Sequence, residues 1–260
     1  MIVNQKTLKS SFTLKGVGLH TGQMSTVTVK PAPVDTWFVF QRMDVDGHPT
    51  IKADVNNVST TQRSTTLEQN GSEVHTTEHI LAALYGMDVD NAIIEIDGPE
   101  LPILDGSAKF WVEAIVKAGL EEQDAEREYF YLNENIKFDS EASGAEYLAI
   151  PDDHYRVTVM VDYHSPLLGT QHASMYHISE FEKEFASCRT FVFLRELVQL
   201  VDAGLIKGGD ANNAIVMVDR EISEADKEKL AKAFNRPSSI IEKTENGILN
   251  NLELRFSNEP

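Results

Sequence analysis

The chain has 260 residues, of which 42% are apolar and 25% are charged, a composition typical of a globular protein with one large domain or two small ones. Its formal net charge of −18 argues against a nucleic-acid partner and against an anionic membrane surface, because both would repel it. The first residues lack the apolar core of a signal peptide, no stretch approaches the ~18 apolar residues of a membrane span, and a single cysteine cannot form an intrachain disulfide. We therefore expect a soluble cytoplasmic protein without stable membrane insertion.

A helix that opens at Glu78 carries the first candidate site. Apolar residues recur there at helical spacing, Thr76 is placed as an N-cap, and Gly86 is placed to end the helix. Glu78 and His79 then fall in the first turn, where exposed backbone N–H groups and the helix dipole keep a carboxylate ionised and fit to accept a proton. A neutral imidazole beside it is a ready zinc ligand. Both residues also suit an ordinary helix start, which is the commoner case, so a metal site is a hypothesis at this point.

A strand and a second helix follow. The residues 91–97 predict a strand, and a helix from Ala108 to Lys117 ends at Gly119. Asp105 precedes this helix and is interpreted as a turn-forming residue in preference to a catalytic one.

The chain then repeats its own pattern. Helix, glycine, loop and strand recur as a helix over Leu194–Val201, Gly204 and a strand over residues 213–219. Each half also opens with the alternating residues of a strand, at 26–29 and at 156–161. The sequence therefore predicts two similar α+β domains, each a β-sheet packed on helices.

A polar run marks the junction between the two domains. It extends from Gln123 to Arg127 and leads into a predicted strand at Tyr129–Leu132. The predicted domains are residues 1–126 and residues 127–260.

The second half contains a candidate hydroxyl. Ser179 to Glu182 has the capping-box pattern and predicts a helix to about Ser187, followed by an extended piece over residues 189–193. Thr190 stands there among apolar side chains, either as a β-branched strand filler or as a hydrogen-bond donor in a dry site. A charged helix over residues 223–234, with acids early and lysines late, is predicted to be a solvated surface element.

Five segments stand in a characteristic order along the chain: Lys15–Gly22, Lys30–Pro33, Thr77–His79, Pro102–Ala108 and Cys188–Phe193. In sequence and spacing they resemble the UDP-3-O-acyl-N-acetylglucosamine deacetylases, the zinc amidases of lipid A synthesis. The resemblance runs from Met1 to the end of the chain, with a departure in the charged stretch 221–245. It implies that helices of the two domains are sandwiched between two sheets and that the active site lies between the domains.

The resemblance also implies a reaction. UDP-3-O-acyl-N-acetylglucosamine would lose its N-acetyl group by hydrolysis to acetate and a free amine. Glu78 would be the general base, His79 a ligand of the zinc cofactor, and Thr190 a donor that stabilises the oxyanion.

Substrate contacts follow from the same resemblance. His20 matches a part of the family's site that lies by the substrate, although a structural role in its turn is an equal alternative. Phe191 would contribute to binding the nucleotide-sugar, since an aromatic face suits a nucleobase or a sugar. The segment 194–209 would form an apolar passage for the 3-hydroxyacyl chain; read without the resemblance, it is a helix that covers a sheet.

One part of the family pattern is missing. A catalytic zinc takes about three protein ligands, and the family draws two of them from a His-Lys-x-x-Asp helix that would follow just after Pro260. We therefore expect an N-terminal fragment of a deacetylase, with a second domain incomplete at its C-terminus, that by itself neither retains zinc nor deacetylates. The family includes fusions with a 3-hydroxyacyl-carrier-protein dehydratase, and the parent could be one of them. The alternatives are a catalytically silent relative that binds a nucleotide-sugar or a protein partner, and an amidase for another acylated amino sugar.

Overall fold

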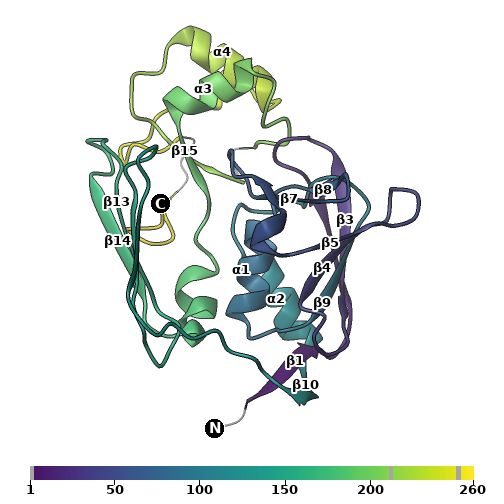
Figure 1. The fold of residues 1–260 in the computed structure, drawn as a ribbon. Coiled ribbons are helices and arrows are strands. Elements are labelled where there is room, and N and C mark those ends of the chain that lie inside the picture. Colours follow the sequence, from purple (N-terminus) through teal and green to yellow (C-terminus); the bar gives the residue numbers. More distant parts are fainter. Residues whose placement is uncertain (1–2, 211–212, 250–252) are drawn as a thin grey trace.

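The computed structural model describes residues 3–210, 213–249 and 253–260. It has an α+β fold in which helices lie between two layers of strands (Figure 1). The fold class expected from the sequence is therefore confirmed. Within the described ranges, no helix is long and apolar enough to cross a membrane.

A five-stranded sheet forms one layer, in the order β2-β3-β9-β4-β5. Its neighbours are antiparallel except for β4 and β9, which are parallel. Buried and less buried side chains alternate along the central strands, as in a sheet that is covered on one face. The strands are β2 (Phe12–Val17), β3 (Met24–Pro31), β4 (Phe38–Arg42), β5 (Thr50–Lys52) and β9 (Ala92–Ile96).

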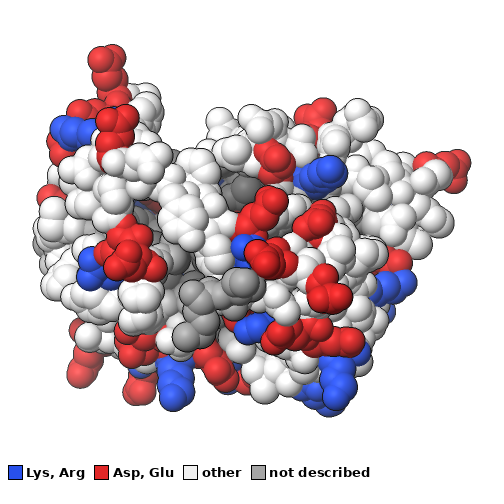
Figure 2. Space-filling view, turned by 60° about the horizontal axis from the view of Figure 1, so that its bottom comes forward, with Lys and Arg blue, Asp and Glu red and all other residues white. Residues whose placement is uncertain are grey.

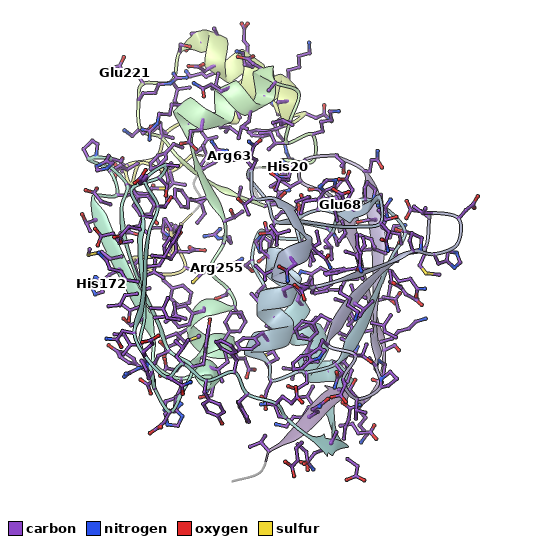
Figure 3. The ribbon with its side chains drawn as sticks, viewed as in Figure 1. His20, Arg63, Glu68, His172, Glu221 and Arg255 are labelled. Carbon is purple, nitrogen blue, oxygen red and sulfur yellow. The ribbon has the colours of Figure 1, made fainter. Side chains whose placement is uncertain are left out.

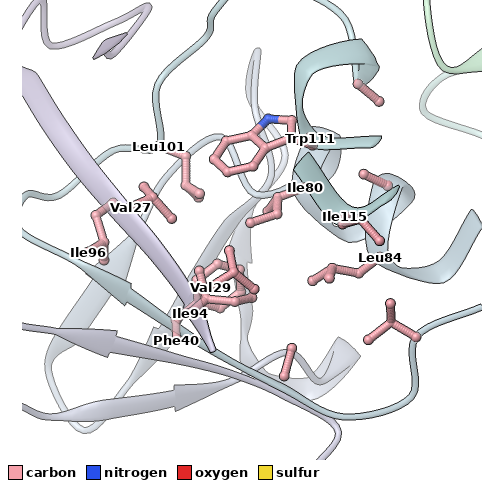
Figure 4. Close-up of a cluster of buried hydrophobic side chains, with 14 of the residues drawn as sticks. Val27, Val29, Phe40, Ile80, Leu84, Ile94, Ile96, Leu101, Trp111 and Ile115 are labelled. Carbon is pink, nitrogen blue, oxygen red and sulfur yellow. The ribbon is translucent and has the colours of Figure 1, made fainter. Parts of the chain in front are cut away.

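Two helices, α1 (Glu78–Gly86) and α2 (Lys109–Ala118), cover the inner face of this sheet (Figure 1). Figure 4 shows their apolar sides packed against the sheet. Burying one such side chain stabilises the fold by about 1.5–3 kcal/mol, so this core holds α1 firmly in place. The side chains that meet there are at most 1% exposed: Val27, Val29, Phe40, Ile94 and Ile96 from the sheet, and Ile80, Leu84, Trp111 and Ile115 from the helices.

Two smaller sheets complete the first half. One is the antiparallel pair of β1 (Asn4–Leu8) and β10 (Leu120–Glu126), which joins the start of the chain to residues far along it. The other has three strands, β6 (Val58–Thr60), β7 (Thr66–Gln69) and β8 (Ser72–Val74), and follows a short 3₁₀ helix at Val55–Asn57. Strand β8 leads directly into the start of α1.

The second half forms the other layer of strands and a pair of helices at one end of the molecule. Strands β11 (Ile136–Asp139) and β12 (Glu146–Ala149) form one antiparallel pair, and β13 (Val157–Asp162) and β14 (Thr170–Met175) form another. Figure 1 shows β13 and β14 opposite the five-stranded sheet, with α1 and α2 between the layers.

A βαβ unit carries the residues around Thr190. Strand β15 (Phe191–Phe193) leads through α3 (Leu194–Asp202) to β16 (Ile215–Met217), and the two strands are parallel. Helix α4 (Glu224–Ala233) packs on α3 through buried apolar side chains, and a 3₁₀ turn at Ser238–Ile240 follows it. Figure 1 shows α3 and α4 together at one end of the molecule.

The predicted repeat of helix, loop and strand is present in both halves. It appears as α1 followed by β9 and as α3 followed by β16, and each of these strands is parallel to a neighbour. The domain division between residues 126 and 127 falls at the end of β10 and stays a prediction.

One prediction at this junction was wrong. The polar run from Gln123 to Glu126 belongs to strand β10, whose backbone pairs with β1. Tyr129–Leu132 forms no strand in the structure, and the Phe130 side chain is 92% exposed. A strand needs an edge to pair with, and the chain has left the β1–β10 pair at this point.

Two helix-capping signals were also misread. Thr76 does not cap α1, because the cap position is Thr77; the helix does end at Gly86, as predicted. Ser179 does not cap a helix either, since it lies inside a 3₁₀ turn (Ile178–Glu180) that passes into a π-helical turn (Phe181–Phe185). The Glu180 carboxylate instead accepts a hydrogen bond from the backbone N–H of Tyr176.

Acidic side chains are prominent on the face seen in Figure 2. This agrees with the formal net charge of −18. The expectation that the protein binds no nucleic acid remains a prediction.

Candidate active site

The first turn of α1 holds Glu78 and His79 side by side. The backbone N–H and the hydroxyl of Thr77 both donate to the carbonyl of Thr65, and the Thr65 N–H donates to Glu78 Oε2 at 2.9 Å. His79 Nε2 lies 4.0 Å from Glu78 Oε1, and the two side chains are 19% and 39% exposed. The carboxylate can therefore meet water, while the imidazole is largely covered.

Burial favours the neutral form of His79. Burial lowers the pKa of His79, and the carboxylates of Glu78 and Asp105 oppose this effect without cancelling it. A neutral imidazole keeps a lone pair that can bind a metal ion. Because Asp105 acts electrostatically on His79, the turn at Asp105 must lie near the start of α1.

Asp105 shapes that turn, as the sequence indicated. Its Oδ1 accepts hydrogen bonds from the N–H and the hydroxyl of Ser107 at 3.1 and 2.8 Å, and its Oδ2 accepts one from Arg255 at 2.8 Å. Burial by itself would raise the pKa of Asp105, but the hydrogen bonds from Arg255 and Ser107 outweigh it and lower that pKa. The Asp105 carboxylate is therefore ionised, and both of its oxygens already accept hydrogen bonds from the protein.

Thr190 lies against the same turn. Its N–H donates to the Gly106 carbonyl at 2.7 Å, and its carbonyl accepts from the Ile215 N–H at 3.0 Å. Gly106 has a φ of 82°, and a Cβ there would lie 2.2 Å from the Asn213 carbonyl oxygen, so only glycine lets the two segments come this close. Within the described part of the chain, the Thr190 hydroxyl has no hydrogen-bond partner and is available to a ligand.

His20 belongs to a separate loop that the Glu100 carboxylate holds through the His20 N–H. Its Nε2 is buried and finds no hydrogen-bond partner among the described residues. The loop after α3 lies against it, because Gly208 donates to the Leu19 carbonyl at 3.0 Å. Figure 3 shows His20 at the side of the molecule toward α3. An unpaired ring nitrogen is compatible with the substrate role predicted for His20, which stays a prediction.

Phe191 is part of an aromatic group and not a free-standing ring. It meets the rings of Tyr163 and Phe193 edge to face, with centroids 5.3 and 5.6 Å apart. Its remaining exposed part could bind a nucleotide-sugar, and this role also stays a prediction.

The described residues do not by themselves fit a catalytic zinc. Among them, no three side chains of His, Cys, Asp or Glu gather in a group that could hold a metal ion. Burial, with a further contribution from the Glu259 carboxylate, raises the pKa of the Cys188 thiol to about 11, so this residue is a protonated thiol and a poor ligand. A catalytic zinc needs about three protein ligands, and His79 supplies one.

Sequence reasoning missed the residues that hold the site together. Arg255, labelled in Figure 3, donates to Asp105 and also to the Ser187 carbonyl at 2.7 Å. Arg189 forms a buried pair with Glu259, with Nε 2.8 Å from Oε1 and Nη2 3.0 Å from Oε2. No signal in the sequence pointed to these pairs, because their partners lie 70 to 150 residues apart.

Comparison with known proteins agrees with the motifs. The family model described as "LpxC: UDP-3-O-acyl N-acetylglycosamine deacetylase" matches residues 5–238. The chain is 46% identical to the "Bifunctional enzyme LpxC/FabZ" of Chlorobaculum tepidum over 261 residues, covering 100% of this chain and 56% of that protein. It is 43% identical to the protein of the same name from Bacteroides thetaiotaomicron, covering 99% of this chain and 56% of the relative.

Shorter relatives match as well. The "UDP-3-O-acyl-N-acetylglucosamine deacetylase" of Bdellovibrio bacteriovorus is 37% identical over 233 residues, which cover 89% of this chain and 76% of the relative. The chain spans about half the length of the bifunctional relatives. By the extent of the family match and by its identity to these relatives, the chain belongs to the UDP-3-O-acyl-N-acetylglucosamine deacetylase family.

Proposed function

We propose that the whole protein hydrolyses the N-acetyl group of UDP-3-O-acyl-N-acetylglucosamine to acetate and a free amine, as a cytoplasmic step of lipid A synthesis. The observation that carries the proposal is the placement of Glu78 and a neutral His79 at the start of α1, near the turn that bonds the Thr190 backbone. The names of the relatives support the same reaction.

The chemistry uses groups from both halves of the chain. Glu78, partly exposed, takes a proton from a water molecule as the water oxygen bonds to the amide carbon. Negative charge then develops on the carbonyl oxygen, and the Thr190 hydroxyl donates a hydrogen bond to it. The C–N bond then breaks, acetate leaves, and the amine nitrogen takes up the proton that Glu78 accepted from the water.

The substrate is proposed to lie along the loop after α3. Leu194, Leu197 and Val198 of α3 are buried in a core shared with α4, while Leu205 is 44% exposed beyond the end of the helix. We therefore assign the passage for the 3-hydroxyacyl chain to the loop end of segment 194–209 and the nucleotide-sugar to the side of His20 and Phe191.

Zinc is proposed as the cofactor of the whole protein, with His79 as one ligand. Because the described residues supply one ligand and a catalytic zinc takes about three, we expect residues 1–260 on their own to lose zinc during purification and to release no acetate. Metal analysis of the 260-residue chain beside the whole protein tests this. One tightly held zinc per 260-residue chain would contradict it.

The described residues would also permit a second candidate function, because no three-ligand group is found among them. In that case the protein keeps the fold, binds a nucleotide-sugar or a protein partner, and does no chemistry.

Acetate release from UDP-3-O-acyl-N-acetylglucosamine by the whole protein separates the two candidates. We expect turnover, and much slower turnover of the same nucleotide-sugar without its 3-O-acyl chain, because remote binding energy contributes to the rate. Binding of the intact substrate in a calorimeter without any acetate release would favour the silent relative instead.

A further inference from the structure

The corner between β8 and α1 is strained. β8 ends at Val74, His75 still pairs with Glu100 as an isolated bridge, and α1 begins two residues beyond Thr76. At this corner Thr76 is 2% exposed and has a φ of 60°, in the left-handed region. A β-branched residue rarely adopts this conformation, which is strained and persists only where the surroundings enforce it.

Glu100 is the group that meets this corner. Its side chain is buried, and its Oε1 accepts a hydrogen bond from the Thr76 hydroxyl at 2.9 Å. Its backbone is fixed as well, because the His75 N–H donates to the Pro99 carbonyl and the Leu101 N–H donates to the His75 carbonyl, at 2.9 and 3.2 Å. The backbone on both sides of Glu100 is thus bonded to His75, and its carboxylate is bonded to Thr76.

The same carboxylate holds the His20 loop. Oε1 accepts from the His20 N–H at 2.9 Å, and Oε2 accepts from the Thr21 N–H at 2.8 Å. Gly18 makes room for it, since a Cβ at that position would lie 2.4 Å from Glu100 Oε2. Within the described residues its partners are backbone N–H groups and one hydroxyl and no Lys or Arg, so the carboxylate is not there to complete an ion pair.

We propose that Glu100 is a positioning residue for the reaction. Its carboxylate holds the Thr76 corner and the His20 loop in a fixed position relative to each other. The position of the Thr76 corner in turn determines where α1 places the Glu78 side chain. The inference rests on the proposed function, because it requires Glu78 to be the general base. Glu100 touches no reacting atom in this scheme and acts only through Thr76 and the His20 loop.

The whole protein with Thr76→Val tests the link to Glu78. Valine keeps the shape of threonine and deletes the hydroxyl, so we expect kcat to fall roughly 10- to 100-fold with KM changed much less, the size expected for a misplaced catalytic group. Thr76→Ser restores the hydroxyl and should recover most of the rate. If the strained valine variant does not fold, Thr76→Gly decides, because glycine adopts a φ of 60° without strain and also lacks the hydroxyl.

Glu100 variants test whether the Glu100 carboxylate holds the Thr76 corner and the His20 loop. Glu100→Ala releases both segments and should lower kcat and raise KM, whereas Glu100→Gln can keep an acceptor for the loop and a donor for Thr76 and should stay near wild type. Gly98→Ala is the matched control, because a Cβ there meets only the Ser25 side chain at an ordinary 3.5 Å. It should leave both constants unchanged.

The decisive comparison places the Thr76 substitution in a Glu78→Gln background. If Thr76 acts through Glu78, Thr76→Val should cost nothing further there, because the base that it positions is already gone. An equal fall in both backgrounds, or a folded Thr76→Gly variant with wild-type kcat, would overturn the proposal. A wild-type rate for Glu78→Gln alone would instead refute the proposed function, so the two failures can be told apart.

Discussion

Thr190 keeps its position through its backbone and not through its hydroxyl. Two backbone hydrogen bonds, to Gly106 and from Ile215, hold it whatever its side chain. Thr190→Val should therefore leave the fold unchanged and lower kcat by about 10²- to 10³-fold, the cost of one lost oxyanion donor, with KM changed less. Steady-state kinetics of the whole protein measure this, with Thr190→Ser as the control that keeps a hydroxyl. A rise in KM alone would assign Thr190 to substrate binding.

Single residues can be named from the sequence where a contiguous motif carries them. Glu78, His79 and Thr190 come from short segments and their roles stay predictions; in the structure Asp105 acts on His79, and the next residue, Gly106, accepts a hydrogen bond from the Thr190 N–H. Glu100 and Arg255 could not be named in this way, because their importance comes from partners distant in sequence. A carboxylate buried among backbone N–H groups leaves no periodic pattern that could be recognised beforehand.

Helix starts show when a capping pattern can be trusted. The Ser223–Asp226 pair forms a complete capping box at the start of α4: the Ser223 hydroxyl accepts from the Asp226 N–H, and the Asp226 carboxylate accepts from the Ser223 N–H. Ser179 has a similar pattern and caps nothing, because the chain there is wound into a 3₁₀ and a π turn. The helix after Ser223 was also predicted to be a solvated surface element, but it buries Leu230 against α3. A capping pattern in the sequence predicts a helical segment, but the packing of that segment determines whether it forms an α-helix, a 3₁₀ turn or a π turn.

The capping box predicts a pH effect. A hydrogen bond from Arg220, with others from Ser223, lowers the pKa of Asp226. A carboxyl whose pKa is lower in the folded state adds stability above its unfolded value of about 4 and loses it as the pH falls below that value. Asp226→Asn should lower the free energy of unfolding by about 0.5–2 kcal/mol at pH 7, and the difference should narrow below about pH 4.

Urea unfolding at several pH values measures this difference. Asp139→Asn is the control, because Asp139 forms an exposed pair with Lys137 and should matter by less than about 0.5 kcal/mol. If Asp226→Asn lowers the free energy of unfolding by the same amount at pH 3 and at pH 7, the proposed role of the Asp226 carboxylate is wrong.

Gly86 shows packing overruling helix propensity. Alanine is about 1 kcal/mol better than glycine inside a free helix. A Cβ at Gly86, however, would lie 2.2 Å from Cδ1 of the Phe181 ring, which packs on α1. Gly86→Ala should therefore lower the free energy of unfolding by about 1–3 kcal/mol. The same substitution made with Phe181→Ala should be neutral or stabilising, and a loss of equal size in both backgrounds would rule out the clash.

At the scale of the molecule, the alternation of strand and helix patterns predicted an α+β fold, and the family resemblance implied that the helices lie between two sheets. The five-stranded order β2-β3-β9-β4-β5 did not follow, because which strands pair depends on long-range contacts and not on local periodicity. The same limit applies to the polar residues Gln123–Glu126, which belong to β10 because β1 offers an edge to pair with.

The central claim is that the two halves of this chain place a general base and an oxyanion donor at one site. Glu78→Gln tests it most directly, since glutamine keeps an acceptor for the Thr65 N–H and leaves the start of α1 in place while it removes the base. In the whole protein we predict that acetate release from UDP-3-O-acyl-N-acetylglucosamine falls by about 10²- to 10⁴-fold, with the thermal unfolding midpoint unchanged. Acetate release at the wild-type rate would contradict the claim.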